Sequence, residues 1–273
     1  MLFRGGRLQA YCLIRNQPWY RCEAFVAGLE SAGHRTQLKR PSHPSKNTLL
    51  VIWNRYGEWH EMACAVEAAG GKVLVAENGY LGTGGTSPKF DVHPAGPKDH
   101  HYYALAFHHH NGGGEWPRGD GSRWERLGIS LKPWREGGEY LLICPNRSFG
   151  IPGRMMHPDW AQRKEAELRK RFPGVAIKVR AHPGNNAPAR PLSEDLLGAK
   201  AVYVWSSTAG LHSLVEGIPT YCDAPFWVAK EAAWKDGEPP PPREPVFERL
   251  AWAQWTLREI YAGIPFRHLL PSA

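Results

Sequence analysis

Two short segments in the second half of the chain carry residue types that bind phosphate. Residues 178–184 (KVRAHPG) and 205–210 (WSSTAG) each follow an apolar run, 175–179 and 201–205, that is typical of a buried parallel strand. In open α/β sheets, ligands bind at the carboxyl ends of strands, where loops and helix N-termini present N–H groups. Two such loops at one sheet edge would form the two sides of a phosphate site.

The first segment offers two basic groups. Arg180 and His182 alternate along an extended stretch, so we expect both to point to the same side. An arginine and an imidazolium placed together suit a phosphate and could offset charge on a departing phosphate oxygen. A turn with two solvated basic groups is the alternative.

The second segment offers hydroxyl groups. Ser206, Ser207 and Thr208 lie where a strand turns into a helix, so they either cap the helix or hold an anion together with backbone N–H groups. We favour the anion site, because both segments occur in successive strand–helix units. Arg147 and Ser148 end another strand and its turn at the same edge, and they are further candidate donor contacts, with capping or solvation as the alternative.

A carboxylate follows a strand in the first half of the chain. Glu77 begins an ENG segment directly after the run 72–76, and a carboxylate at a strand end can act as a general base on an incoming hydroxyl. A helix or turn cap is the alternative. The chain has neither a G-x-x-x-x-G-K-[ST] segment nor a G-x-G-x-x-G after a strand, so it has no kinase or dinucleotide signature.

Composition favours an anionic partner. The 273 residues carry a net charge of +8 and 12 Trp, which suits a nucleotide, a polyanionic glycan, nucleic acid or a membrane face, although ordinary solubility charge is the alternative. The 5 cysteines are widely spaced and form no C-x-x-C pair, which indicates reduced thiols. Without an apolar run of membrane-spanning length, we expect a cytoplasmic protein, in the host cytoplasm if a phage encodes it.

Hydrophobic periodicity predicts an α/β fold with parallel sheets. The loop-rich stretch 81–138 separates two halves that each alternate strand and helix, and four prolines at 239–242 precede a long terminal helix. The expected strands are 8–14, 48–53, 72–76, 140–144, 175–179, 201–205 and 219–222, and the expected helices are 19–32, 58–69, 159–172, 192–197, 208–216 and 244–262.

Taken together, these segments resemble the motif set of capsule Kdo transferases and bacterial sialyltransferases. The acidic-acidic-Gly-aromatic motif is matched by residues 77–80 (ENGY), the Lys-x-His-Pro motif by 178–183 with two extra residues, and the Ser-Ser/Thr motif by 206–208. The helix that follows (209–214) and residues 225–227 (PFW) continue the likeness to the Kdo transferases, whereas 81–138 matches poorly.

The resemblance implies a metal-independent glycosyltransferase of the GT-B type, with two Rossmann-like domains facing a cleft. We expect an acceptor-side domain at 1–137, a nucleotide-sugar domain at 138–242, and a C-terminal helix at 243–273 that crosses back to the first domain. By this resemblance Glu77 is the base, and His182 contacts the donor phosphate. No cofactor is expected besides the UDP- or CMP-linked sugar that serves as co-substrate. The expected donor contacts are Arg147, Ser148, Arg180, His182, Ser206, Ser207, Thr208 and Glu216.

The chain departs from the family pattern at two positions. The second acidic residue is Asn78, and if the family base lies there, Asp91 or Asp99 would replace it. The acid on the helix after the Ser-Ser-Thr segment is His212, and Glu216, one turn away, could substitute for it. The donor nucleotide therefore stays open among CMP, UDP and GDP.

The acceptor has two interpretations. Tryptophans and basic residues interleave over 116–135, and such a surface could bind phosphates and stack bases. We therefore favour a hydroxymethylated pyrimidine in DNA, flipped out to reach the cleft, as in compact phage-encoded transferases. A capsule or lipid glycan is the alternative. The expected acceptor contacts are Asn78, Tyr80, Asp91, His110, Trp116 and Arg118.

Two other functional classes stay open from the sequence. A non-catalytic nucleic-acid-binding protein would use the same basic surface, and a nucleotide-sugar epimerase shares the GT-B motifs. The histidines at 100–101 and 108–110 do not predict a metal site, because adjacent side chains of a strand point to opposite faces.

Overall fold

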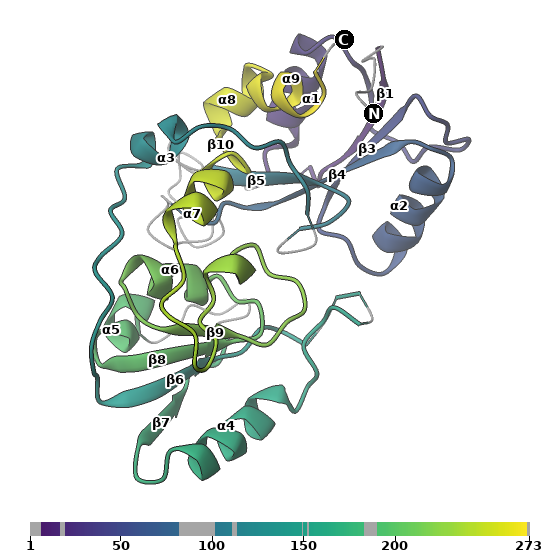
Figure 1. The fold of residues 1–273 in the computed structure, drawn as a ribbon. Helices are drawn as coiled ribbons and strands as arrows, with labels where there is room; N and C mark the ends of the chain where they lie inside the picture. Colours follow the sequence, from purple (N-terminus) through teal and green to yellow (C-terminus); the bar gives the residue numbers. More distant parts are fainter. Residues whose placement is uncertain are drawn as a thin grey trace. The chain divides into compact units, whose positions relative to one another are not determined.

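A computed structural model describes residues 7–16, 20–81, 102–110, 114–148, 150–151, 153–182 and 190–271. It confirms the α/β class, with helices packed on two largely parallel sheets (Figure 1). The chain divides into unit 1, Met1–Asp120 with Ala251–Ala273, and unit 2, Gly121–Leu250. The boundaries that the sequence predicts lie after residues 137 and 242.

The sheet of unit 1 has parallel strands at one side and antiparallel strands at the other. Its order is β10 (Gln254–Thr256), β5 (Tyr102–Phe107), β4 (Lys72–Asn78), β3 (Thr48–Trp53), β1 (Gln9–Leu13) and β2 (Arg35–Gln37). Strands β1 to β4 run parallel, whereas β5 is antiparallel to β4 and β10 to β5. The carboxyl ends of β1, β3 and β4 therefore lie at one edge.

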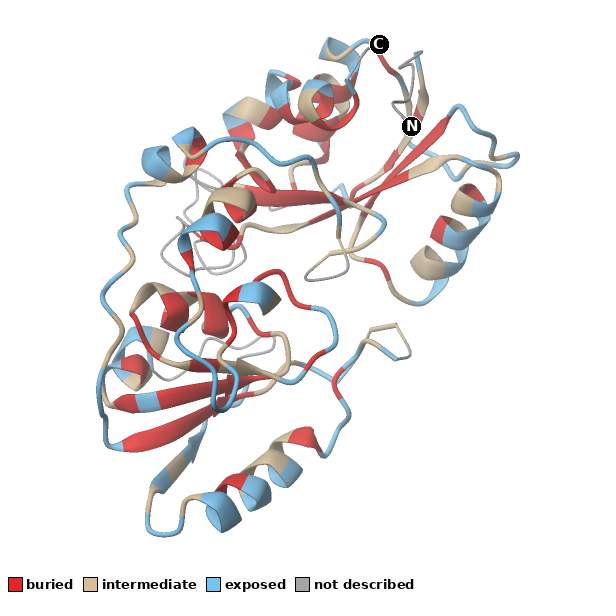
Figure 2. Ribbon diagram, viewed as in Figure 1, coloured by how far each residue is buried: buried red, intermediate tan, exposed pale blue. Residues whose placement is uncertain are grey.

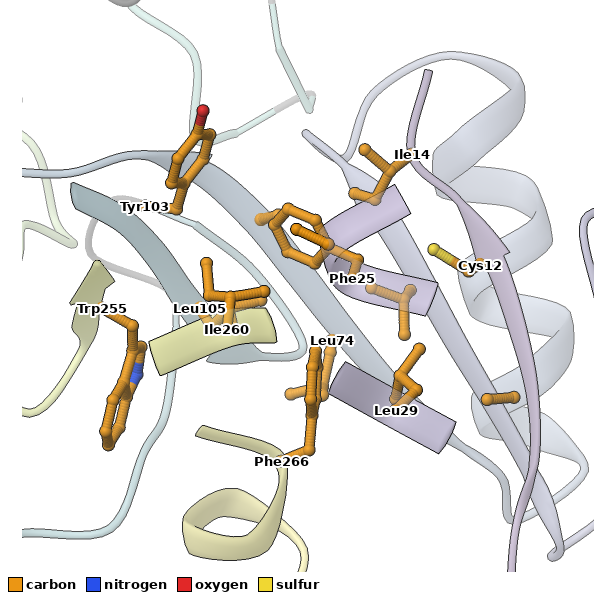
Figure 3. Close-up of a cluster of buried hydrophobic side chains, with 14 of the residues drawn as sticks. Cys12, Ile14, Phe25, Leu29, Leu74, Tyr103, Leu105, Trp255, Ile260 and Phe266 are labelled. Carbon is orange, nitrogen blue, oxygen red and sulfur yellow. The ribbon is translucent and has the colours of Figure 1, made fainter. Parts of the chain in front are cut away.

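Both faces of this sheet are covered by helices. Along β3, Leu49 and Val51 join the core beneath α1 (Cys22–Ser31), α8 (Leu257–Tyr261) and α9 (Ile264–Leu269). Leu50 and Ile52 join a second core beneath α2 (Glu58–Ala68). This explains why β3 is an unbroken apolar run, which Figure 2 shows as buried. Figure 3 shows the first core, where side chains of α1, the strands and the terminal helices interdigitate.

A glycine lets two of these helices approach closely. A Cβ added at Gly28 of α1 would lie 1.9 Å from the carbonyl oxygen of Ile260 in α8 and 2.7 Å from the Phe266 ring. Only a residue without a side chain fits there. The absence of a side chain at Gly28 thus allows α1 to pack directly against the C-terminal segment.

The sheet of unit 2 is entirely parallel. Its order is β7 (Ala176–Val179), β6 (Tyr140–Cys144), β8 (Ala199–Val204) and β9 (Thr220–Cys222). One face packs on α4 (Trp160–Arg171), through Leu141, Ile143 and Tyr203. Toward the other face, Val204 of β8 approaches Gly210 of α6 (Ala209–Val215). The remaining helices of the unit are α3 (Ser122–Leu127), α5 (Leu192–Leu197), the short 3-10 helix η1 (Lys230–Ala232) and α7 (Glu244–Ala251).

The single terminal helix predicted over 244–262 is wrong. Helix α7 ends at Ala251, and residues Gln254–Thr256 then form β10 beside β5. The apolar spacing suited a helix, but Trp255 is paired with Tyr103 across the strands and is fully buried. Strand pairing thus overrides the helical period. The stretch 81–138, expected to be loop-rich, also contains β5 and α3.

We expect Gly28→Ala to destabilise unit 1. The added methyl group would meet the backbone of α8, which cannot move without repacking, at a cost of about 3 kcal/mol in the free energy of unfolding. This outweighs the gain of about 1 kcal/mol from replacing a helical glycine by alanine. Urea unfolding measures the change. In the matched variant Gly121→Ala, the added Cβ would lie 3.4 Å from Glu248, so a similar loss there would contradict the explanation.

Candidate functional site

The strand order of unit 2 brings three loops to one edge of its sheet. Strand β6 lies between β7 and β8, and all three run parallel, so the segments that follow them emerge together. The chain goes from β6 to β7 on one side and then to β8 on the other. In open α/β sheets, ligands bind at such a reversal, outside the carboxyl ends of the strands.

A side chain joins the two loops at this reversal. The Oδ1 of Asn146, which follows β6, accepts a hydrogen bond of 2.9 Å from the backbone N–H of Ser206, which follows β8. The bond holds the Ser-Ser-Thr segment against the β6 loop. Asn146 is not among the donor contacts that the sequence predicts, although, like its neighbours Arg147 and Ser148, it is a polar residue that closely follows a buried strand.

His182, after β7, is electrostatically coupled to the β6 loop. Burial of its ring and then the positive charge of Arg147 lower the pKa of His182 below its ordinary value. His182 itself is exposed to solvent. At neutral pH the imidazole is then mostly neutral, and Arg147 supplies the positive charge. Arg147 and Ser148 are both exposed at this edge.

The Arg180 guanidinium is held by an acidic partner. It forms an ion pair with Asp195 of α5, and its Nη2 donates to the carbonyl oxygen of Arg190 at 2.9 Å. Both side chains of the pair are only 14% exposed. Strand β7 ends at Val179, so the strand alternation that would place Arg180 beside His182 does not continue to these residues. A direct role of Arg180 on phosphate stays a prediction.

The hydroxyl segment and Glu216 lie at the two ends of α6. Ser207 is buried, and its hydroxyl accepts a 3.3 Å hydrogen bond from the N–H of Ala209, which is local capping. Thr208 is exposed, and its side chain makes no capping bond. Glu216 follows the last turn of α6 and binds Lys132 at 2.5 Å. Burial lowers the pKa of His212, which lies between these ends of the helix.

In unit 1, Glu77 is the penultimate residue of β4. Its carboxylate accepts a hydrogen bond from the Asn54 amide and, through Oε1, a 2.8 Å bond from the Asn78 N–H. The N–H of Tyr80 donates 2.9 Å to Oε1 of Gln254, and Tyr80 itself is buried. The turn after β4 is thus bound to β10.

The other predicted acceptor contacts have varied surroundings. Trp116 packs against the core of unit 1, Arg118 is exposed, and the His110 ring stacks on His109 with their centroids 4.7 Å apart. Asp91, as well as the fallback Asp99, lies outside the described residues.

Much of the basic, tryptophan-rich stretch serves the packing of unit 2. The Trp124 ring contacts Phe247, with centroids 5.2 Å apart, and the buried Arg243 guanidinium lies 4.0 Å from the centroid of Trp134. Arg135 donates to three carbonyl oxygens around residues 196–199. These side chains have structural partners, so the pattern that suggested a DNA surface has an intramolecular explanation.

Two negative findings apply to the described part of the chain. Its histidines, cysteines and carboxylates do not form a group of three or more suited to a metal ion. Likewise, the helices seen there are too short or too polar to cross a membrane.

Comparison with known proteins shows similarity in fold. No protein-family model and no curated protein matches the sequence. The beta Kdo 2,4 transferase of KpsC from Thermosulfurimonas dismutans gives a TM-score of 0.61 at 13% identity, over 91% of this chain and 92% of that chain. The beta Kdo 2,7 transferase of the same protein gives 0.54 at 13% identity, over 96% and 100%. At this identity the likeness concerns the fold.

We expect Asn146→Ala to loosen the loop after β8. The Ser206 N–H would lose its acceptor, at a cost of about 1–2 kcal/mol in the free energy of unfolding of unit 2. Hydrogen exchange at the Ser206 amide should become faster than in the wild type. Asn146→Asp keeps an acceptor oxygen and should retain protection. Equal protection of this amide in the alanine variant would show that the bond does not hold the loop.

Proposed function

We propose that this chain is a glycosyltransferase of the GT-B arrangement, which transfers a sugar from a nucleotide-sugar to a hydroxyl group of a glycan or glycolipid. The observation that carries the proposal is the convergence of the loops after β6, β7 and β8, bound together by Asn146 and Ser206. The fold likeness to two Kdo transferases supports it.

The donor phosphate would bind at this edge of unit 2. Arg147 offers a permanent positive charge. His182 offers a ring N–H, and a bound anion would favour protonation of its imidazole. The exposed Thr208 hydroxyl and the backbone beside it would complete the contacts. This set would offset the charge that develops on the phosphate oxygen as the nucleotide leaves.

Glu77 of unit 1 would act as the base. Its carboxylate would take the proton of the acceptor hydroxyl. The oxygen of that hydroxyl would then form the new bond to the anomeric carbon of the sugar. The bond from that carbon to the nucleotide phosphate breaks, and the phosphate leaves with its electron pair. This scheme requires no metal ion.

A glycan acceptor is preferred over DNA. Both Kdo transferases that share the fold are named for sugar transfer, and a CMP-linked Kdo is therefore the first donor to test. The DNA hypothesis depended on an interleaved Arg and Trp surface, of which Trp124, Trp134 and Arg135 have partners inside unit 2. Hydroxymethylated DNA is therefore the second acceptor to test.

We expect Glu77→Gln to slow transfer strongly and leave nucleotide binding intact. The amide cannot accept the hydroxyl proton, so kcat should fall at least about 100-fold. Incubation with CMP-, UDP- and GDP-sugars, followed by mass spectrometry of glycan, glycolipid and hydroxymethylated DNA, measures transfer. Glu61→Gln, at an exposed position of α2, is the matched control. Full turnover in Glu77→Gln would place the base elsewhere, and sugar mass on DNA alone would reverse the choice of acceptor.

We expect His182→Ala to weaken nucleotide binding about tenfold at pH 6. The pKa of His182 is lowered in the free protein, and a bound phosphate would raise it again. Binding would then take up a proton, so affinity should increase as the pH falls toward the pKa of the bound imidazole, and this contribution of His182 should vanish in the variant. Thermal shift and calorimetry with CMP, UDP and GDP test this. His43→Ala, at an exposed position of unit 1, is the control. No stabilisation of the wild type by any nucleotide would refute the transferase proposal.

A further inference from the structure

The turn after β3 places a polar side chain directly on the predicted base. Asn54 follows the last residue of β3, and its N–H donates 3.1 Å to the carbonyl oxygen of Ala76, which extends the β3–β4 pairing by one step. The Asn54 side chain then reaches the next residue of β4 and donates its amide N–H to Oε2 of Glu77. The contact therefore follows from the strand register.

The backbone at this position is unusual. Asn54 has φ of 64°, in the left-handed region, which non-glycine residues rarely adopt and which asparagine tolerates best among them. Glycine would adopt this conformation with less strain. Asparagine permits this turn and, unlike glycine, adds an amide that reaches Glu77.

The residue after Asn54 holds the turn in place through buried hydrogen bonds. Arg55 is 5% exposed, and its guanidinium donates to both carboxylate oxygens of Glu67 in α2, at 2.8 and 2.7 Å. It also donates to the carbonyl oxygen of His108, at the end of β5. Burial alone would raise the pKa of Glu67, but the hydrogen bonds from Arg55 and His108 outweigh it and lower the pKa. The ion pair thus stays intact at neutral pH.

The two carboxylate oxygens of Glu77 consequently have donors from two directions. Oε2 is bound by the Asn54 amide from the β3 turn, and Oε1 by the backbone N–H of Asn78 at 2.8 Å. These two contacts bind the two oxygens separately. The second donor fixes the plane of the group, and with it the direction of the lone pairs that would accept a proton.

We infer that Asn54 is a positioning residue for Glu77, and that the turn from β3 to α2 fixes the orientation of the base. This inference rests on the proposed function of Glu77. A carboxylate that rotates would spend less time aligned with the acceptor hydroxyl, so the loss should appear in kcat, with little change in donor affinity.

The test uses Asn54→Gly, which removes the amide and keeps the left-handed backbone. We expect kcat to fall about 10- to 100-fold, with unchanged nucleotide affinity. Added to Glu77→Gln, the same change should cause no further loss, because both act on one group. Asn47→Gly, at an exposed position of the same unit, is the matched control and should keep full activity.

Different outcomes separate this inference from the proposed function. Full kcat in Asn54→Gly, or an undiminished further loss in the Glu77→Gln background, would overturn the positioning role. Absence of transfer by the wild type, or full turnover of Glu77→Gln, would instead refute the assigned activity or base. Crystal structures of wild type and Asn54→Gly give a readout without activity. The Glu77 carboxylate should rotate in the variant, and an unchanged carboxylate would overturn the inference.

Discussion

Each sheet starts from an interior strand, and this constraint determines where side chains from distant segments meet. Crossovers between parallel strands are right-handed, so a chain that moves first to one side of its starting strand and then to the other must send its helices to opposite faces. The loops beside the reversal diverge and leave polar backbone groups accessible. Strands β6 and β8 flank the reversal in unit 2, and β1 and β3 flank it in unit 1.

Elements with a strong local signal could be predicted from the sequence within one or two residues. Strands β3 and β6 are unbroken apolar runs that only a fully buried position explains, and helices α2 and α4 have clear periods. β5 cannot be placed from the sequence, because it lies between Gly-, His- and Pro-rich segments that indicate loops. The sequence predicts a helix where β10 lies, because the apolar spacing there fits the helical period as well as the strand period. The partner strand lies some 150 residues away in the sequence, so local patterns do not reveal it.

In the candidate site, too, some features follow from local sequence patterns and others do not. That Glu77, Arg147, His182 and Ser206 stand at strand ends follows from local patterns, and the structure places them there. Their partners could not be predicted, because Asp195 meets Arg180 only in the folded unit 2, and Asn54 meets Glu77 only through the β3–β4 register. A sequence pattern finds positions along a strand, whereas pairing between side chains depends on the tertiary fold.

The placement of β10 affects the order in which the protein can form during synthesis. Unit 2 is continuous along the chain, so a ribosome releases all its strands and helices before residues 251–273 emerge. Unit 1 needs those last residues to cover Tyr103 and to supply Gln254, which binds the turn after β4. The first segment must therefore wait, with part of its apolar sheet uncovered, until translation has passed through the whole second unit.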